Sequence, residues 1–191
     1  PDAGSIMIND VDIVEKPQFA KQKVGFLSTK TGLYNRLTAQ ENIEYFAKLH
    51  GMNKDVIAEE GAALYKQLEI EPYLHRRTDT LSSGMLQKVS IARAVIHQPD
   101  VLILDEPTTG LDIMATEAIL SFIETQREIG RPVIFSTHHL DEVQMLANKV
   151  AIINNGTSCF NGSIDELKNN TGFDDLRRAF MHLVTDIKED V

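Results

Sequence analysis

The sequence is poor in cysteine and in long apolar runs. Cys159 is the only cysteine among 191 residues, which excludes an internal disulfide and a zinc site built from several cysteines. A reducing compartment is the simplest interpretation of this composition. No apolar run approaches the roughly 20 residues that span a bilayer, and the chain shows no secretory signal at its start. Any link to a membrane must therefore run through a partner or the surface.

Basic residues are also scarce. The chain has 19 Lys and Arg against 28 Asp and Glu, for a formal charge of −9. That balance argues against a general nucleic-acid-binding surface, which needs a net basic face. Apolar residues make up 42% of the chain, enough for a folded core. The length fits one domain of ordinary size with room for a small subdomain.

The first half of the chain predicts short strands followed by a helical block. Residues 5–13 predict a strand, a turn near Asn9-Asp10 and a short extension, and residues 23–28 predict a buried strand. Thr38 with Glu41 three positions later forms a capping box at the start of a helix. Further helices are expected, one at about 54–68 and one that begins at the serines near position 82. Residues 38–98 thus form a helical block inserted between strands.

The second half alternates strands and helices. The expected elements are a strand at 101–105, a helix ending at Gly130, a strand at 131–137, a short helix at 140–149, a hairpin at 150–162 with Asn155-Gly156 as its turn, and closing helices at 163–170 and 174–187. This order predicts an α/β fold with a mainly parallel sheet covered on both faces. Ligands of such sheets bind at the carboxyl ends of the strands.

Two neighbouring carboxylates, Asp105 and Glu106, follow the expected strand 101–105. An Asp in that position can hold Mg²⁺ on a nucleotide, usually through water. The next carboxylate points elsewhere, because side chains alternate along an extended chain, and it can polarise an attacking water. The competing interpretation is a pair of solvated charges that cap the next helix, and the dipeptide alone favours it.

Histidines follow the next strand. His138 could contact a terminal phosphate and orient a water, or it could be a surface or helix-capping histidine. His139 fits better as the first outward residue of the following helix.

A serine- and glycine-containing segment precedes the helix near position 82. Its residues are Leu81, Ser82, Ser83, Gly84 and Met85. Backbone N–H groups, hydroxyls and the positive end of the helix dipole make such a segment an anion site. An ordinary serine N-cap explains the five residues equally well on their own.

The order and spacing of these segments resemble the ATP-binding-cassette ATPase family over nearly the whole chain. The resemblance rests on "LSSGMLQKVSIARAVIHQPDVLILDEPTTGLD" followed by "VIFSTHHLDEV". The sequence segment "GFLS…TGLYNRLTA" resembles bacterial cassettes of the sodium-exporter type, which pair with a separate membrane permease. The resemblance implies a P-loop NTPase-like core with an inserted α-helical subdomain.

By resemblance, each motif acquires a role. Asp105 would bind Mg²⁺ through water, Glu106 would act as general base, and His138 would sense the γ-phosphate of ATP. The signature segment 81–85 would contact the γ-phosphate of ATP held by a second ATPase subunit. Asp112 would help to couple the two sites across that dimer.

The family pattern is not matched everywhere. The signature usually reads Leu-Ser-Gly-Gly-Gln, and here Ser83 and Met85 replace the first glycine and the glutamine, while Ser82 and Gly84 are kept. We therefore expect the anion contact to survive. The place of the family's Q-loop glutamine falls at Thr29, which is too short to reach the metal in the same way.

The phosphate-binding loop is missing from the 191 residues. Such a loop reads G-x-x-x-x-G-K-[ST], and the sequence contains no Gly-Lys dipeptide. "GFLSTKT" at 25–31 is rejected because it lacks the second glycine and no helix is expected after it. The "Pro-Asp-x-Gly" turn at 1–4 matches the family's turn after the phosphate-loop helix, so we expect a domain incomplete at its N-terminus, with an exposed apolar patch and poor solubility.

The resulting expectation is a partial cassette ATPase. Residues 1–37 and 99–163 would form the core sheet with its helices, 38–98 the helical subdomain facing a membrane permease, and 164–191 the closing helices. The resemblance implies ATP and Mg²⁺ as ligands, a second ATPase subunit as partner, export as the direction of transport, and a cytoplasmic position on the inner face of the membrane. Alternatives are a non-catalytic module that lends its signature segment to an intact cassette, and a cassette protein with no role in transport.

Overall fold

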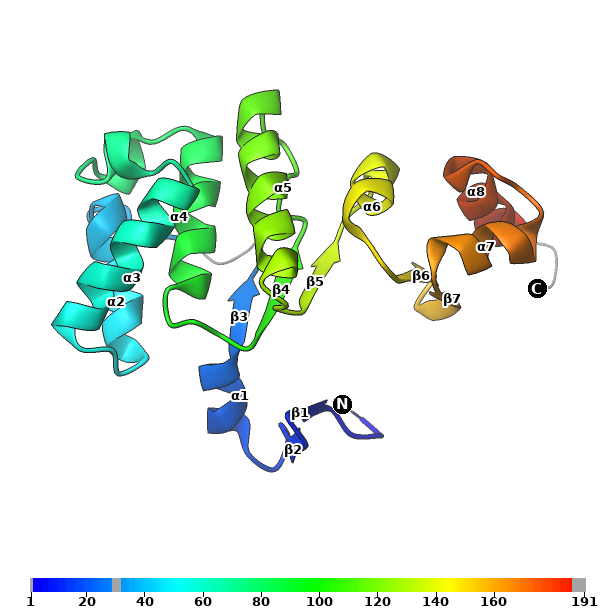
Figure 1. The fold of residues 1–191 in the computed structure, drawn as a ribbon, viewed down its shortest axis with the longest axis horizontal. Helices are drawn as coiled ribbons and strands as arrows, with labels where there is room; N and C mark the ends of the chain where they lie inside the picture. The colour runs from blue at the N-terminus through cyan, green and yellow to red at the C-terminus, as the bar shows by residue number, and fades with distance from the viewer. Residues whose placement is uncertain (1, 29–31, 187–191) are drawn as a thin grey trace. The chain divides into compact units, whose positions relative to one another are not determined.

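A computed structural model describes residues 2–28 and 32–186 of the chain. Within them, the helices and strands occupy the following ranges: β1 Met7–Ile8, β2 Val11–Asp12, α1 Pro17–Lys23, β3 Val24–Leu27, α2 Ala39–Leu49, α3 Lys54–Gln67, η1 Glu71–Tyr73, η2 Thr78–Thr80, α4 Ser83–Val95, β4 Val101–Asp105, α5 Ile113–Glu128, β5 Val133–Ser136, α6 Leu140–Leu146, β6 Val150–Asn154, β7 Thr157–Gly162, α7 Ile164–Thr171 and α8 Leu176–Asp186. Figure 1 shows their order along the chain.

The chain divides into two compact units, residues 1–136 and 137–191. The first contains the parallel sheet with strand order β3-β4-β5, and the second contains the antiparallel pair β6-β7. The α/β class with a parallel sheet is confirmed. The finer domain boundaries expected from the sequence stay a prediction.

One face of the parallel sheet is buried and the other is open. Side chains alternate, so Leu27, Leu102 and Leu104 are almost fully buried on the first face. On the opposite face Phe26 is 55% exposed and Ile134 is 62% exposed. The expectation of a sheet covered on both faces is therefore wrong for the described residues. The exposed apolar patch expected from the sequence is present.

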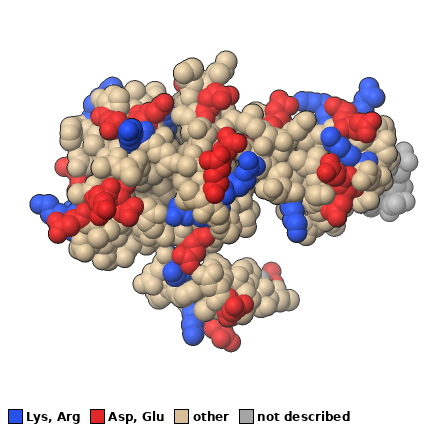
Figure 2. Space-filling model, viewed as in Figure 1, with Lys and Arg blue, Asp and Glu red and all other residues tan. Residues whose placement is uncertain are grey.

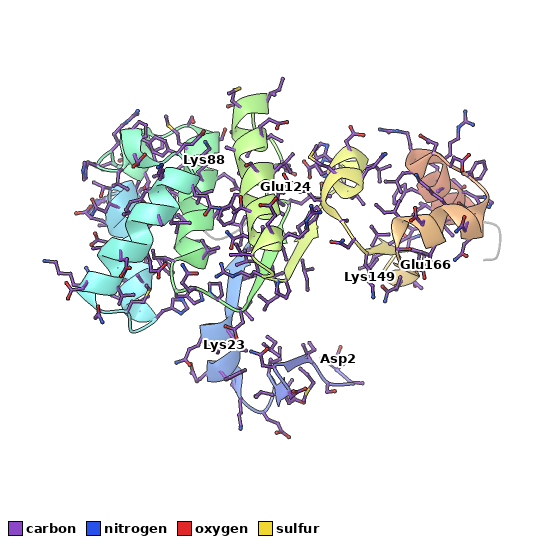
Figure 3. All side chains as sticks on the ribbon, viewed as in Figure 1. Asp2, Lys23, Lys88, Glu124, Lys149 and Glu166 are labelled. Atoms are coloured by element: carbon purple, nitrogen blue, oxygen red, sulfur yellow. The ribbon has the colours of Figure 1, made fainter. Side chains whose placement is uncertain are left out.

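The buried face packs closely against α4, and Gly25 makes this possible. A Cβ at Gly25 would lie 2.6 Å from the Ala94 carbonyl oxygen and 2.7 Å from Leu102 Cδ2. Helix α4 is buried along most of its length, including the charged Lys88 and Arg93. Lys88, labelled in Figure 3, donates to Glu69 Oε2 at 2.7 Å, and Arg93 donates to the Gly32 carbonyl at 3.0 Å. Because both cations have acceptors, their burial is compatible with a stable core.

The helical part of the first unit is organised by a buried amide. Both bonds of the expected capping box between Thr38 and Glu41 are present at the start of α2. Asn42, fully buried one position later, accepts from the Tyr34 N–H at 2.8 Å and donates to the Tyr34 and Thr38 carbonyls. The side chain of Asn42 thus fixes the loop before α2 to the helix itself.

Helix α1 was not expected from the sequence. It is a short helix with Pro17 at its first position, which is the favoured place for proline. Its last residue, Lys23, forms an ion pair with Asp100 at 3.2 Å, and Asn9 donates to Asp100 at 2.6 Å. Asp100 therefore joins the turn between β1 and β2, the end of α1 (Figure 3) and the start of β4.

The second unit has its own small core, made of Ile152, Leu167, Leu176 and Ala179. The turn between β6 and β7 at Asn155-Gly156 is confirmed, and both residues have the positive φ that such a turn requires. Ser163 and Glu166 form a capping box at the start of α7. None of the helices in the described residues has the length and hydropathy needed to cross a bilayer.

Charges of both signs are mixed on the surface. Figure 2 shows Lys and Arg side chains interspersed with Asp and Glu side chains on the viewed face. The expectation that the protein has no nucleic-acid partner rests on the charge of −9 and stays a prediction.

Candidate functional site

The two carboxylates lie at the carboxyl end of β4, and a serine of the neighbouring strand contacts both residues. Ser136, the last residue of β5, pairs in register with Asp105. Its hydroxyl donates to Asp105 Oδ1 at 2.8 Å and accepts from the Glu106 N–H at 2.9 Å. The end of β4 is thereby joined to the end of β5 at the edge where parallel sheets bind ligands.

Glu106 has an unusual backbone conformation. Its φ is 48°, a value that few residues other than glycine adopt. The chain turns sharply here, and Thr109 Oγ1 donates to Glu106 Oε2 at 2.6 Å. Such conformations persist only where the surroundings hold them, and they are concentrated at functional sites.

The carboxylate pair does not cap the next helix. Helix α5 begins at Ile113, and its N-cap is Asp112, whose Oδ1 accepts from the Ala115 N–H at 2.9 Å. The helix-capping interpretation of Asp105 and Glu106 is therefore wrong. It applies instead to Asp112, whose expected role in coupling two subunits stays a prediction.

The signature segment occupies the start of α4 as expected. Ser82 is the N-cap, and its hydroxyl oxygen accepts from the Met85 N–H at 3.3 Å. Because that oxygen acts as acceptor, the hydroxyl proton of Ser82 can still be donated to an anion. Ser82 and Ser83 are exposed, whereas Leu81 and Met85 are half-buried. Two exposed hydroxyls at a helix N-terminus are compatible with an anion site.

Gly84 has a packing role that the sequence did not reveal. It is buried, and a Cβ there would lie 2.7 Å from the Ala115 Cβ of α5 and 3.7 Å from Asp112 Oδ2. Gln87, one turn further along α4, donates to the Pro107 carbonyl at 2.7 Å. The signature helix is thus in direct contact with the segment that links the carboxylates to α5.

Two expected site residues are not placed with this group. Thr29 lies outside the described residues. His138 belongs to the second unit, where it is exposed and its ring lies 4.1 Å from that of His139. His139 takes the N-cap position of α6 and is exposed, as expected for the first outward residue of that helix. The role of His138 at a γ-phosphate stays a prediction.

The donor set fits a magnesium ion that arrives with a nucleotide. The described residues contain no group of three or more His, Cys, Asp or Glu side chains that could hold a metal by themselves. Mg²⁺ commonly uses one or two carboxylates together with substrate phosphates and waters. Asp105, half-buried at a strand end, can supply such a carboxylate.

Sequence reasoning missed two residues of this site, Ser136 and Thr109. Thr109 is three residues from Glu106 and lies within the segment "TTGLD" that ends at Asp112, but the sequence indicated no role for its side chain. Ser136 is 31 residues from Asp105 in the sequence, and only the strand register brings them together.

Comparison with known proteins agrees with this geometry. The family model described as "ABC transporter" matches residues 1–109. The chain belongs to the ABC transporter family. The match includes both carboxylates and the signature segment.

Relatives and a solved structure extend the match to almost the entire chain. It is 39% identical over 182 residues to the ABC transporter ATP-binding protein NatA of Bacillus subtilis, covering 95% of this chain and 74% of NatA. It is 30% identical to the doxorubicin resistance ATP-binding protein DrrA of Mycobacterium tuberculosis, covering 90% of this chain and 52% of DrrA.

The solved ATP-binding subunit of an ABC transporter superposes with a TM-score of 0.86 at 26% identity, covering 96% of this chain and 77% of that one. The chain thus spans about three-quarters of NatA and about half of DrrA.

Proposed function

We propose that this chain belongs to an ATP-hydrolysing subunit that powers export through a membrane permease. ABC transporter ATP-binding subunits bind ATP with Mg²⁺, and they generally pair with permeases and dimerise. The observation that carries the proposal is the position of Asp105 and Glu106 at the carboxyl end of β4, bonded to Ser136 of β5. Similarity to DrrA, a doxorubicin resistance ATP-binding protein, favours export.

The roles of the residues follow from their chemistry. Mg²⁺, when bound with ATP, neutralises phosphate charge. Asp105 would hold it through water, and Glu106 would accept the proton of the attacking water. The Ser82 hydroxyl and the N-terminal amides of α4 would bind the γ-phosphate of ATP on a second subunit. His138 would contact the γ-phosphate of its own subunit.

The partners follow from the same assignment. The helical block would face the permease from the cytoplasmic side of the membrane. A hollow of about 510 Å³ lies at the start of this block, lined by Leu33, Tyr34, Asn35, Arg36, Leu37 and Tyr45. The rings of Tyr34 and Tyr45, which both line this hollow, are in edge-to-face contact, with ring centroids 5.4 Å apart. Exposed aromatic side chains of this kind are enriched in protein interfaces.

The 191 residues as they stand are expected neither to bind nor to hydrolyse ATP, because they contain no Gly-Lys phosphate loop. The amides and the lysine of that loop neutralise most of the β- and γ-phosphate charge. Loss of even one such preorganised donor can cost about 3–4 kcal/mol in rate.

The test supplies the missing element in the same polypeptide. A strand, phosphate loop and helix joined before Pro1 should give Mg-ATP hydrolysis, and Glu106→Gln should lower kcat by at least about 100-fold, the scale of general-base catalysis. Glu117→Gln, an exposed position on α5, is the matched control and should keep full activity. The proposal would be contradicted if the Glu106→Gln variant still hydrolysed ATP at the full rate, or if the 191 residues alone hydrolysed ATP.

The second candidate is a non-catalytic module that supplies its signature segment to an intact cassette, favoured by the intact helix cap at Ser82. In this case the chain would stimulate an intact cassette that carries its own phosphate loop but has a damaged signature. Stimulation would be lost on Gly84→Ala and kept in Glu106→Gln. The catalytic proposal requires the opposite dependence on Glu106.

A further inference from the structure

Ser136 contacts both members of the carboxylate pair. Its hydroxyl donates to Asp105 Oδ1 at 2.8 Å and accepts from the Glu106 N–H at 2.9 Å. A hydroxyl has one proton to give and two lone pairs, so a single serine can make both bonds at once. Alanine or valine in this position could make neither.

The two bonds act on groups that need support. The left-handed backbone of Glu106, with φ of 48°, is disfavoured for a residue with a side chain and requires the surroundings to hold it. Asp105 is half-buried at a strand end, where rotation of the carboxylate would change which oxygen is available to a ligand. Hydrogen bonds to ionised groups are the stronger class.

We propose that Ser136 is a positioning residue of the ATPase site. It fixes the carboxylate of Asp105 through Oδ1 and the backbone turn of Glu106 through its amide, so that the metal-binding and proton-accepting groups keep one relative arrangement. Thr109, which donates to Glu106 Oε2 at 2.6 Å, acts on the Glu106 side chain and is separate from this bridge. The inference rests on the proposed function for its catalytic consequence, but the bridge itself can be measured without catalysis.

The first measurement is made on the 191-residue chain. Ser136→Ala should speed hydrogen exchange of the Glu106 amide by about fivefold, the effect of losing one typical hydrogen bond. Ser136→Thr keeps the hydroxyl, suits a strand, and should restore slow exchange. Ser121→Ala, an exposed serine on α5, is the control and should leave the Glu106 amide unchanged. Equal exchange in Ser136→Ala and the unmodified chain would overturn the bridge.

The second measurement uses the subunit as it occurs in the cell, assembled with its permease. Ser136→Ala should lower kcat by about 10- to 100-fold, the range found for groups that orient metal ligands, with KM for ATP changed by less than about twofold. Ser136→Thr should recover most of the lost kcat. A general loss of folding would instead be visible as a lower melting temperature in Ser136→Ala.

The outcomes separate this inference from the proposed function. If Glu106→Gln abolishes turnover while Ser136→Ala leaves kcat intact, the function stands and the positioning role is wrong. If Glu106→Gln has no effect, the proposed function fails, and the exchange of the Glu106 amide still decides whether the bridge exists. A loss of kcat in Ser136→Ala that Ser136→Thr does not repair counts against the role of the hydroxyl.

Discussion

At the residue scale, a stacked pair of histidines lies where the C-terminal ends of two helices meet. His50 is the C-cap of α2, and His97 follows α4. Their ring centroids are 3.7 Å apart with an angle of 9° between the planes. Burial, and to a lesser degree the neighbouring His50 and Arg131, lower the pKa of His97 to about 4. Burial also lowers the pKa of His50.

This pair predicts a loss of stability in acid. His97 has a pKa of about 6.5 when unfolded and about 4 when folded, so between these values the unfolded chain binds more protons. Stability is therefore fully present above pH 6.5 and is lost as pH falls towards 4. After allowance for partial exposure, His97 should account for about 1 kcal/mol of the decrease in unfolding free energy between pH 7.5 and 5.

Chemical denaturation at the two pH values measures this contribution. His97→Gln should reduce the decrease by that amount, and the matched control is His75→Gln, at an exposed position. An unchanged pH dependence in His97→Gln would mean that His97 binds its proton equally in the folded and unfolded states, which contradicts a lowered pKa in the folded protein.

Residues recognised by local chemistry were predictable from the sequence. Thr38 caps α2 through residues within one helical turn, and Asn155-Gly156 forms its turn from its own backbone preferences. Ser136 and His97 were not predictable in this way. Their partners, Asp105 and His50, lie 31 and 47 positions away. The sequence indicated that residues 136–139 and Asp105 both lie at carboxyl ends of strands, but not the register that pairs Ser136 with Asp105.

At the element scale, helices α4 and α5 meet with almost no space between them. Gly84 lies at the second position of α4, and a Cβ there would be 2.7 Å from Ala115 Cβ. Asp112, the N-cap of α5, is the next nearest group. A change at Gly84 therefore displaces both the signature helix and the segment that leads from Glu106 to α5.

The contact can be tested by exchanging the two side chains. Gly84→Ala should lower the unfolding free energy by about 1–3 kcal/mol, the cost of overpacking a dense interior. Adding Ala115→Gly makes space for the new methyl group and should recover most of the packing loss, less about 1 kcal/mol for a glycine within a helix. Calorimetric melting of the two single variants and the double variant gives the coupling energy. Strictly additive losses would contradict direct contact between these positions.

Elements were predicted where periodicity was strong and missed where it was weak. Helix α4 was expected from the helical spacing of four apolar residues, all of which are buried: Val89, Ile91, Ala92 and Val95. Lys88 and Arg93 of α4 are buried as well. Their burial is tolerated because Lys88 donates to the Glu69 carboxylate and Arg93 donates to the Gly32 carbonyl. Helix α1 has seven residues, none of them buried. Its sequence therefore has no periodic apolar pattern from which a helix could be predicted.

At the scale of the whole molecule, the open face of the parallel sheet exposes apolar side chains of the first unit. Phe26, Ile103 and Ile134 lie in one row across β3, β4 and β5, as the register shows. Phe26 and Ile134 are more than half exposed. Apolar residues adjacent in a row form a continuous patch, and such patches promote association between molecules. The apolar sequences of the strands suggested that both faces of the sheet are buried. The composition of a strand shows how hydrophobic its side chains are, but not whether another element covers each face.

This patch predicts that polar substitutions improve solubility at little cost in stability. Phe26→Thr with Ile134→Thr should raise the concentration at which the chain stays monomeric and reduce binding of a hydrophobic dye, while each substitution changes the unfolding free energy by less than about 0.5 kcal/mol. Threonine keeps a good strand propensity, so the ladder should persist. Light scattering and dye fluorescence measure the result.

The same substitution on the opposite face provides the matched control. Leu102 is fully buried, next to Ile103 on β4, and Leu102→Thr should cost about 2–4 kcal/mol because it leaves both a cavity and a buried hydroxyl. Ile153→Thr, at a side chain 71% exposed on β6, tests whether any exposed apolar group has the same effect. Solubility that rises equally with Ile153→Thr would mean that association does not depend on the open face of the sheet, whereas a gain confined to Phe26 and Ile134 places it there.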